Sequence, residues 1–150
     1  MIALLAMLVT TSTNMAQPAL QPWSYLVGHC WTGAAPGDSG QDKHCFEAVF
    51  GGQHVRDRHV VTVGGRDVYV GETIYSAQGP AVIFTYWNSL GGLGTGKASY
   101  SAGEWRFTGT IHATANGTEE PMYATWRKVN AGYEVLEAPG AKPRLFRRAD

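Results

Sequence analysis

The sequence carries no excess charge of either sign, because 12 Lys and Arg residues balance 12 Asp and Glu residues. A neutral chain has no overall field that attracts nucleic acid or an anionic membrane, so we expect no nucleic-acid partner. Cysteine is scarce, and the two that are present show no CxxC or CxxH spacing, which is a poor basis for a zinc site. No GxSxG motif supports nucleophilic catalysis. We therefore expect neither a metal nor a cofactor.

Long apolar runs are confined to the start of the chain. Ile2–Val9 is uncharged, and it is followed by polar residues 10–14 and by the small residue Ala16. Such a run is too short to span a bilayer as a helix and is typical of a secretory signal peptide. We predict a signal peptide over residues 1–16 and a single domain over residues 17–150, which is secreted or periplasmic and has no membrane span. The alternative is an ordinary buried N-terminal segment.

The two cysteines agree with export. Cys30 and Cys45 flank a polar, Gly-rich loop, residues 34–43, between two predicted strands. Neighbouring strands bring such a pair within disulfide reach, and an oxidising compartment keeps the bond closed. We predict a Cys30–Cys45 disulfide, which would stabilise the fold by roughly 3 kcal/mol.

Helix-forming runs are nearly absent, and short runs rich in Val, Ile, Phe, Tyr and Thr take their place. Between His44 and Asn88, four such runs are cut by Gly51-Gly52, Gly64-Gly65 and Gly79-Pro80. Paired glycines reach the positive φ angles of tight hairpins, so these runs predict an antiparallel meander. Similar runs continue to the C-terminus.

About ten strands follow from this pattern, and none is joined to the next by a helix long enough for a parallel crossover. Closure would remove the exposed edges of such a sheet, so we predict an all-β fold, a single up-and-down antiparallel β-barrel. Before the first strand, Trp23, Leu26 and Val27 fall at i, i+3 and i+4. This spacing predicts a short N-terminal helical plug that ends at Gly28.

The segments LVGHCWTG, GETIY and TYWNS, in this order, resemble a group of uncharacterised bacterial secreted proteins with calycin-like barrels. The resemblance extends roughly from Trp23 to Trp126. Calycins include lipocalins and fatty-acid-binding proteins, so it implies a barrel that carries a small, mostly apolar ligand. The calycin pattern G-x-W places Trp two residues after Gly, whereas here Trp31 follows Gly28 by three. Trp31 takes the calycin role only if a bulge intervenes.

The Gly51-Gly52 hairpin predicts two faces. One face carries Cys45 opposite Arg58 and Glu47 opposite Arg56, and the other carries His44 opposite His59 and Phe46 opposite Asp57.

The next hairpin allows two registers. A two-residue turn at Gly64-Gly65 sets Asp57 against Glu72, a repulsive pair unless a proton or a metal lies between the carboxylates. That register would bring His44, His59, Asp57 and Glu72 together, a set of metal-ligand types without any HxH spacing. A three-residue loop that includes Arg66 sets Arg58 against Glu72 instead. Charge complementarity favours this second register.

The second register places four charged residues on one face. Inside a barrel, this face would form a polar floor for a ligand, together with aromatic side chains. Outside, the charges would form solvated ion pairs of little energetic value. The candidate ligand-binding residues are Glu47, Arg56, Arg58, Glu72, Tyr86 and Trp31.

Three functions remain open at this point. The first is a small-molecule-binding barrel whose ligand is small and partly apolar. The second is a barrel enzyme that uses Glu72 or Asp57 as general acid or base. The third is a structural envelope protein with a filled barrel. A small molecule is the only partner that the sequence suggests.

Overall fold

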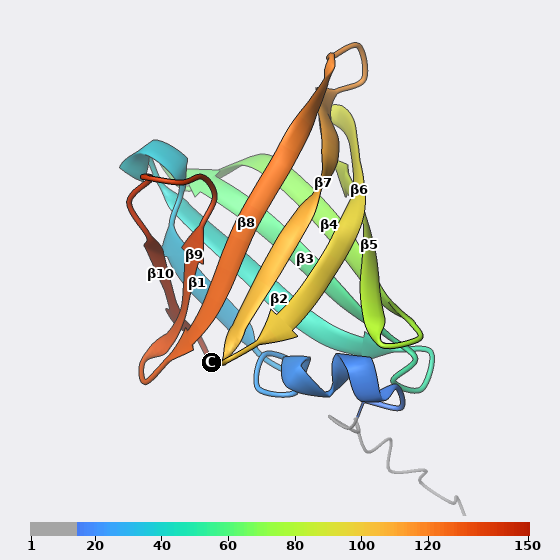
Figure 1. Cartoon of the computed structure of the whole chain (residues 1–150). Helices are drawn as coiled ribbons and strands as arrows, with labels where there is room; N and C mark the ends of the chain where they lie inside the picture. Colours follow the sequence, from blue (N-terminus) through green and yellow to red (C-terminus); the bar gives the residue numbers. More distant parts are fainter. Residues whose placement is uncertain (1–14) are drawn as a thin grey trace, which may run out of the picture.

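Ten antiparallel strands close into a single up-and-down barrel, as the sequence predicts (Figure 1). The computed structural model describes residues 15–150. Each strand pairs with its neighbours in sequence, and β1 pairs with β10 to close the ring. The strands are β1 Cys30–Ala34, β2 Gln41–Val49, β3 His54–Val63, β4 Arg66–Gln78, β5 Ala81–Asn88, β6 Gly91–Ser101, β7 Glu104–Thr114, β8 Glu119–Val129, β9 Gly132–Leu136 and β10 Arg144–Arg148.

The predicted signal peptide falls almost entirely outside the described residues and stays a prediction. Of residues 1–16 the structure describes only the last two. The side chain of Met15 is buried, and the N–H of Ala16 donates a hydrogen bond of 2.9 Å to the carbonyl of Gly52. Within residues 15–150, no helix has the length and apolar character needed to cross a bilayer.

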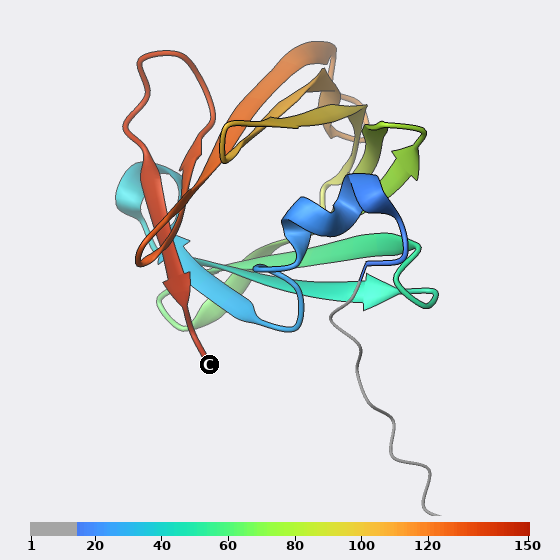
Figure 2. The same cartoon turned by 60° about the horizontal axis from the view of Figure 1, so that its bottom comes forward.

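Two 3-10 helices accompany the barrel. The first, η1, covers Pro18–Trp23 and lies at one end of the barrel, and the second, η2, covers Pro36–Asp38 (Figure 2). The helix predicted to end at Gly28 instead covers Pro18–Trp23, so its predicted end is wrong, and proline is tolerated in its first turn. The predicted apolar face is nevertheless correct, since Trp23, Leu26 and Val27 are all buried.

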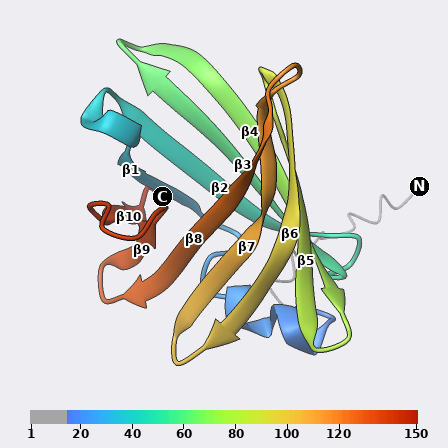
Figure 3. The same ribbon diagram turned by 45° about the horizontal axis from the view of Figure 1, so that its top comes forward.

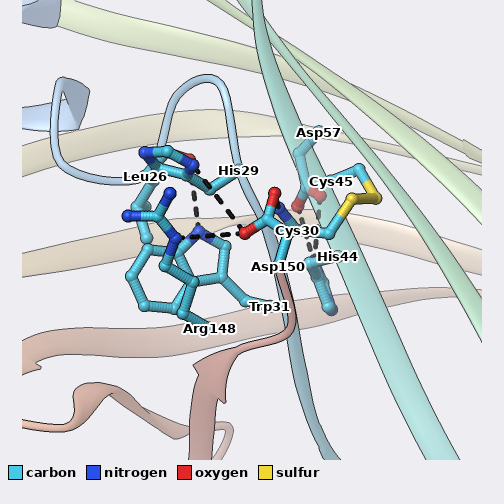
Figure 4. Close-up of a disulfide and its surroundings, with 9 residues drawn as sticks. All are labelled: Leu26, His29, Cys30, Trp31, His44, Cys45, Asp57, Arg148 and Asp150. Atoms are coloured by element: carbon cyan, nitrogen blue, oxygen red, sulfur yellow. Dashed lines mark hydrogen bonds and ion pairs between the residues drawn. A yellow bond between two sulfur atoms is a disulfide. The ribbon is translucent and has the colours of Figure 1, made fainter.

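The hairpin between β2 and β3 has the predicted pairing. Glu47 lies opposite Arg56, and His44 lies opposite His59. The disulfide is also as predicted: Cys30 and Cys45 are direct cross-strand partners whose Cα atoms are 4.1 Å apart (Figure 4). It joins the first two strands covalently.

The hairpin between β3 and β4 has the predicted pairing for a different reason. Arg58 does lie opposite Glu72, but the turn consists of Gly64 and Gly65 alone, with φ angles of 56° and 76°. The expected three-residue loop is therefore wrong. A β-bulge supplies the extra residue, because Val61 pairs with Tyr69 and Thr62 pairs with Asp67, which leaves Val68 without a partner.

The interior of the barrel near η1 is filled by aromatic side chains. Trp23 is completely buried, with its ring centroid 4.1 Å from that of Tyr75 and 4.7 Å from that of Trp105. Phe46, Phe107 and Trp126 pack around the same indole. Inward residues alternate with outward ones along β2 from Gln41 to Glu47, as a half-buried sheet requires.

The barrel is closed by few residue pairs at β10. β10 pairs with β1 only through Trp31 with Arg148 and Thr32 with Arg147. It pairs with β9 through three residues, Arg144, Leu145 and Phe146. All other neighbouring strands share five or more pairs.

We expect Trp23→Ala to lower the free energy of unfolding by about 3–5 kcal/mol, because it leaves a large cavity in this aromatic cluster. Trp23→Phe should cost clearly less. It keeps most of the packing, and the indole N–H that it removes has no hydrogen-bond partner within residues 15–150. Urea unfolding followed by circular dichroism measures both variants. Equal losses for Ala and Phe would contradict the role assigned to this ring.

Candidate functional site

The six predicted binding residues divide between the two sides of the barrel wall. Tyr86 and Trp31 face inward, Tyr86 being half-buried and Trp31 buried. The four charged residues face outward, because they alternate with the inward residues Phe46, Asp57 and Thr73. The expectation that Glu47, Arg56, Arg58 and Glu72 form a polar floor inside the barrel is therefore wrong. Whether they bind a ligand from outside stays a prediction.

Three of these charged residues line a groove of about 800 Å³ on the outer surface. Its walls are the segment before β1, the neighbouring parts of β2 and β3, and the C-terminal residue; they include Val27, His29, Glu47, Arg56, Arg58 and Asp150. Glu47 forms an ion pair with Arg56. The Asp150 carboxylate lies 3.1 Å from Arg148 Nε and near the backbone N–H of Cys30 (Figure 4).

A second set of polar side chains lies inside the barrel, away from η1. We refer to it as the polar cluster. It consists of Asp42 and His44 from β2, Asp57 and His59 from β3, Tyr69 from β4, Tyr86 from β5 and Arg144 from β10. Asp42 and Asp57 are each 2% exposed. All seven residues occupy inward positions of the two-residue alternation.

His44 is the centre of the polar cluster. Its Nδ1 lies 3.0 and 2.9 Å from the two carboxylate oxygens of Asp57 (Figure 4). Its Nε2 lies 3.4 Å from Oδ1 of Asp42. The ring of His59 stacks on it, with centroids 4.6 Å apart and planes inclined by 20°. Nδ1 of His59 lies 3.1 Å from the same oxygen of Asp42. Both imidazoles therefore converge on a single carboxylate oxygen.

Two further contacts hold the edges of the polar cluster. Arg144 donates from one nitrogen to Oδ2 of Asp42 at 3.1 Å and to the carbonyl of Ala34 at 2.8 Å. Its other terminal nitrogen donates to Glu137 at 2.5 Å. On the opposite side, Nε2 of His59 lies 3.4 Å from the hydroxyl of Tyr86, which is hydrogen-bonded to that of Tyr69.

The protonation of the polar cluster follows from these contacts. Burial disfavours a charged His44, but the charge of Asp57 and the hydrogen bonds to Asp42 and Asp57 outweigh it and raise the pKa of His44 to about 9. Burial also disfavours a charged Asp42, yet hydrogen bonds from His44 and His59 hold the pKa of this carboxyl well below its ordinary value. The metal-free cluster therefore contains an imidazolium between two carboxylates at neutral pH.

Sequence reasoning found part of the polar cluster. It placed His44, His59 and Asp57 on one face, but it expected them to approach one another only in the register that pairs Asp57 with Glu72. The β2–β3 hairpin alone is sufficient to unite them. Asp42 was missed because it was assigned to the loop of residues 34–43. Asp42, His44 and Phe46 follow one another at intervals of two residues, as the inward positions of one strand do. This spacing is the signal that could have found Asp42.

Asp42, His44 and His59 also form a group that could hold a metal ion. One donor atom of each residue lies within 4.8 Å of the others. Neither the comparison with protein-family models nor that with curated proteins returns a match for the sequence, so the chemistry of the site rests on its own geometry.

We expect the stability of the protein, measured with a chelator present, to fall between about pH 6.5 and pH 9. His44 is more basic in the folded chain, with a pKa of about 9, than at its ordinary value of 6.5. Its contribution is therefore complete below the lower value and is lost as pH rises through the upper one, on the order of 3 kcal/mol in total. Asp42 acts in the opposite sense, and its contribution is lost as pH falls below about 4.

Urea unfolding at a series of pH values tests this expectation. His44→Gln should flatten the alkaline decline, whereas His54→Gln should keep it, because His54 lies on the outer face of β3, bonded to Ser76. An unchanged alkaline decline in His44→Gln would show that another group causes it.

Proposed function

We propose that the protein is an exported small-molecule-binding barrel, whose ligand is small and partly apolar and enters at the end of the barrel opposite η1. The observation that carries the proposal is the polar cluster. Two buried carboxylates, two histidines and an arginine are costly to desolvate, and apolar residues of the same volume would give equal or greater stability. A barrel that retains such groups inside does so for a ligand or for a specific strand arrangement.

The accessibility of the inner wall supports entry at this end. His59, Tyr69 and Tyr86 face inward and yet are only half-buried. The same holds for Ile111 and Met122 on the facing strands. Solvent therefore reaches the inner wall here, whereas the residues around Trp23 are fully enclosed.

The chemistry of this wall defines the ligand. Ile111 and Met122 offer apolar contact, which would supply most of the affinity. The phenols of Tyr69 and Tyr86 offer hydrogen bonds that would fix the orientation. Gly94 lies between Tyr86 and Ile111 in the register and adds no side chain to the wall. We infer a neutral molecule with an apolar ring or chain and a single hydrogen-bonding group.

Two features favour export and closure of the other end. The Cys30–Cys45 disulfide suits an oxidising compartment outside the cytoplasm. We infer that η1 acts as a plug, because Trp23 fills the interior beneath it.

The sequence offers two carboxylates for acid–base catalysis. Glu72 lies on the outer face opposite Arg58, and both oxygens of Asp57 face Nδ1 of His44.

The outer groove beside Arg56 and Arg58 is the second candidate site for a ligand, favoured by its volume and its charged walls.

Titration with the fluorescent probe N-phenylnaphthylamine tests the proposal. This probe is apolar and carries a single N–H. We expect binding by the parent protein, a roughly fivefold weaker affinity in Tyr86→Phe because one hydrogen bond is lost, and no binding in Ile111→Trp because an indole fills the opening.

Arg58→Met is the matched control, since Arg58 lies in the outer groove and not on the inner wall. It should bind the probe like the parent. If Arg58→Met weakens binding while Tyr86→Phe and Ile111→Trp do not, the ligand site is the outer groove and the interior site is wrong.

A further inference from the structure

We propose that Asp42, His44 and His59 bind a divalent transition-metal ion inside the barrel, with zinc as the best match to this set of ligands. The two strands that supply them, β2 and β3, are adjacent near the viewer's upper left in Figure 3. The inference does not require the small-molecule site, and it departs from the expectation, based on the absence of sequence motifs, that the chain binds no metal.

The spacing of the donor atoms suits a metal ion. Oδ1 of Asp42 lies 3.4 Å from Nε2 of His44 and 3.1 Å from Nδ1 of His59. Zinc binds imidazole nitrogen and carboxylate oxygen at about 2.0–2.2 Å in tetrahedral geometry, which places neighbouring ligand atoms about 3.3–3.6 Å apart. The three donor atoms also come from inward positions of two neighbouring strands and lie within 4.8 Å of one another.

Each proposed ligand is held by a second contact on its far side. The Nδ1 atom of His44 faces both oxygens of Asp57, and Oδ2 of Asp42 accepts from Arg144. Nε2 of His59 faces the hydroxyl of Tyr86. Metal-binding histidines commonly donate their other N–H to a carboxylate or another oxygen in this way, which fixes the tautomer and aims the free nitrogen at the metal. Asp57 is thus a positioning residue for His44.

The charge of the neighbourhood also suits a divalent cation. With both imidazoles neutral, as metal coordination requires, this neighbourhood holds three carboxylates and one guanidinium. Asp42 and Glu137 accept from Arg144, and Asp57 faces His44. Three negative charges against one positive charge leave a net charge of −2 in this set. One divalent ion neutralises it.

The nature of the ligands defines what the metal would do. Three protein ligands leave at least one coordination position for water or for a donor atom of a small molecule. His59 is half-buried and lies next to Tyr86, on the inner wall that solvent reaches. A metal at this place would face the same space as the proposed ligand.

Metal binding can be measured on the full chain, carrying an affinity tag without histidine and stripped with a chelator before use. Equilibrium dialysis against zinc, followed by elemental analysis, should find one equivalent bound. Cobalt should give the visible absorption bands of a site with two imidazole ligands. His59→Gln should weaken zinc binding on the order of 100-fold, and Asp57→Asn about 10–100-fold through His44.

His54→Gln provides the matched control, because His54 is a half-buried histidine of the same strand, on the outer face and bonded to Ser76. It should bind zinc like the parent. Circular dichroism establishes that each variant is folded, and zinc should raise the unfolding temperature of the parent but not of His59→Gln. Less than a tenth of an equivalent in the parent, or equal binding by His59→Gln and His54→Gln, would overturn the proposal.

Discussion

The register between β2 and β3 is the constraint on which both candidate sites depend. With Glu47 opposite Arg56, every inward position of these strands is fixed, and a slip of one residue would exchange the two faces. The turn around Gly51 and Gly52 sets this register from one end. The disulfide then holds β2 against β1, so that the position of His44 relative to Trp31 is fixed as well. The polar cluster and the outer groove are the two sides of this one piece of sheet.

The interior of the barrel combines two kinds of packing. Around Trp23 it is an aromatic core, in which contact area and burial stabilise the fold. Around Asp42 it is a network of charged and polar groups, in which the cost of desolvation is offset by hydrogen bonds between opposite charges. His44 joins the two regions, since its ring packs against Phe46 on one side and against His59 on the other. The aromatic half gives the barrel its stability, and that stability allows the buried charges of the polar half to be retained.

Sequence reasoning predicted the strands and the pairing of β2 with β3, because turn glycines and alternation are local signals. It also predicted the closed barrel and the disulfide. The pairing of Arg58 with Glu72 followed from charge complementarity, although the loop assumed for it is wrong. Sequence reasoning could not decide which face points inward, since Val60 and Val70 share the face of the charged residues while Val55 and Val61 lie on the other. The face of Phe46 also carries aromatic residues of β4 and β5. Following the register across these strands would have shown which face points inward. The bulge at Val68 has no clear sequence signature. Arg144 could not be connected to Asp42 before closure was known, because the two residues are 102 positions apart.

The strand with the fewest residue pairs, β10, is where local opening of the barrel would cost least. Five residue pairs in all hold this strand, fewer than hold any other strand of the barrel, so its detachment breaks the fewest ladder hydrogen bonds. Arg144 belongs to this strand and donates to Asp42. Opening of this seam would therefore withdraw a guanidinium from the carboxylate on which both imidazoles converge. Opening of the seam and the charge balance inside the barrel are therefore coupled. A cation that neutralises Asp42 from inside the barrel would take the place of the guanidinium that β10 supplies.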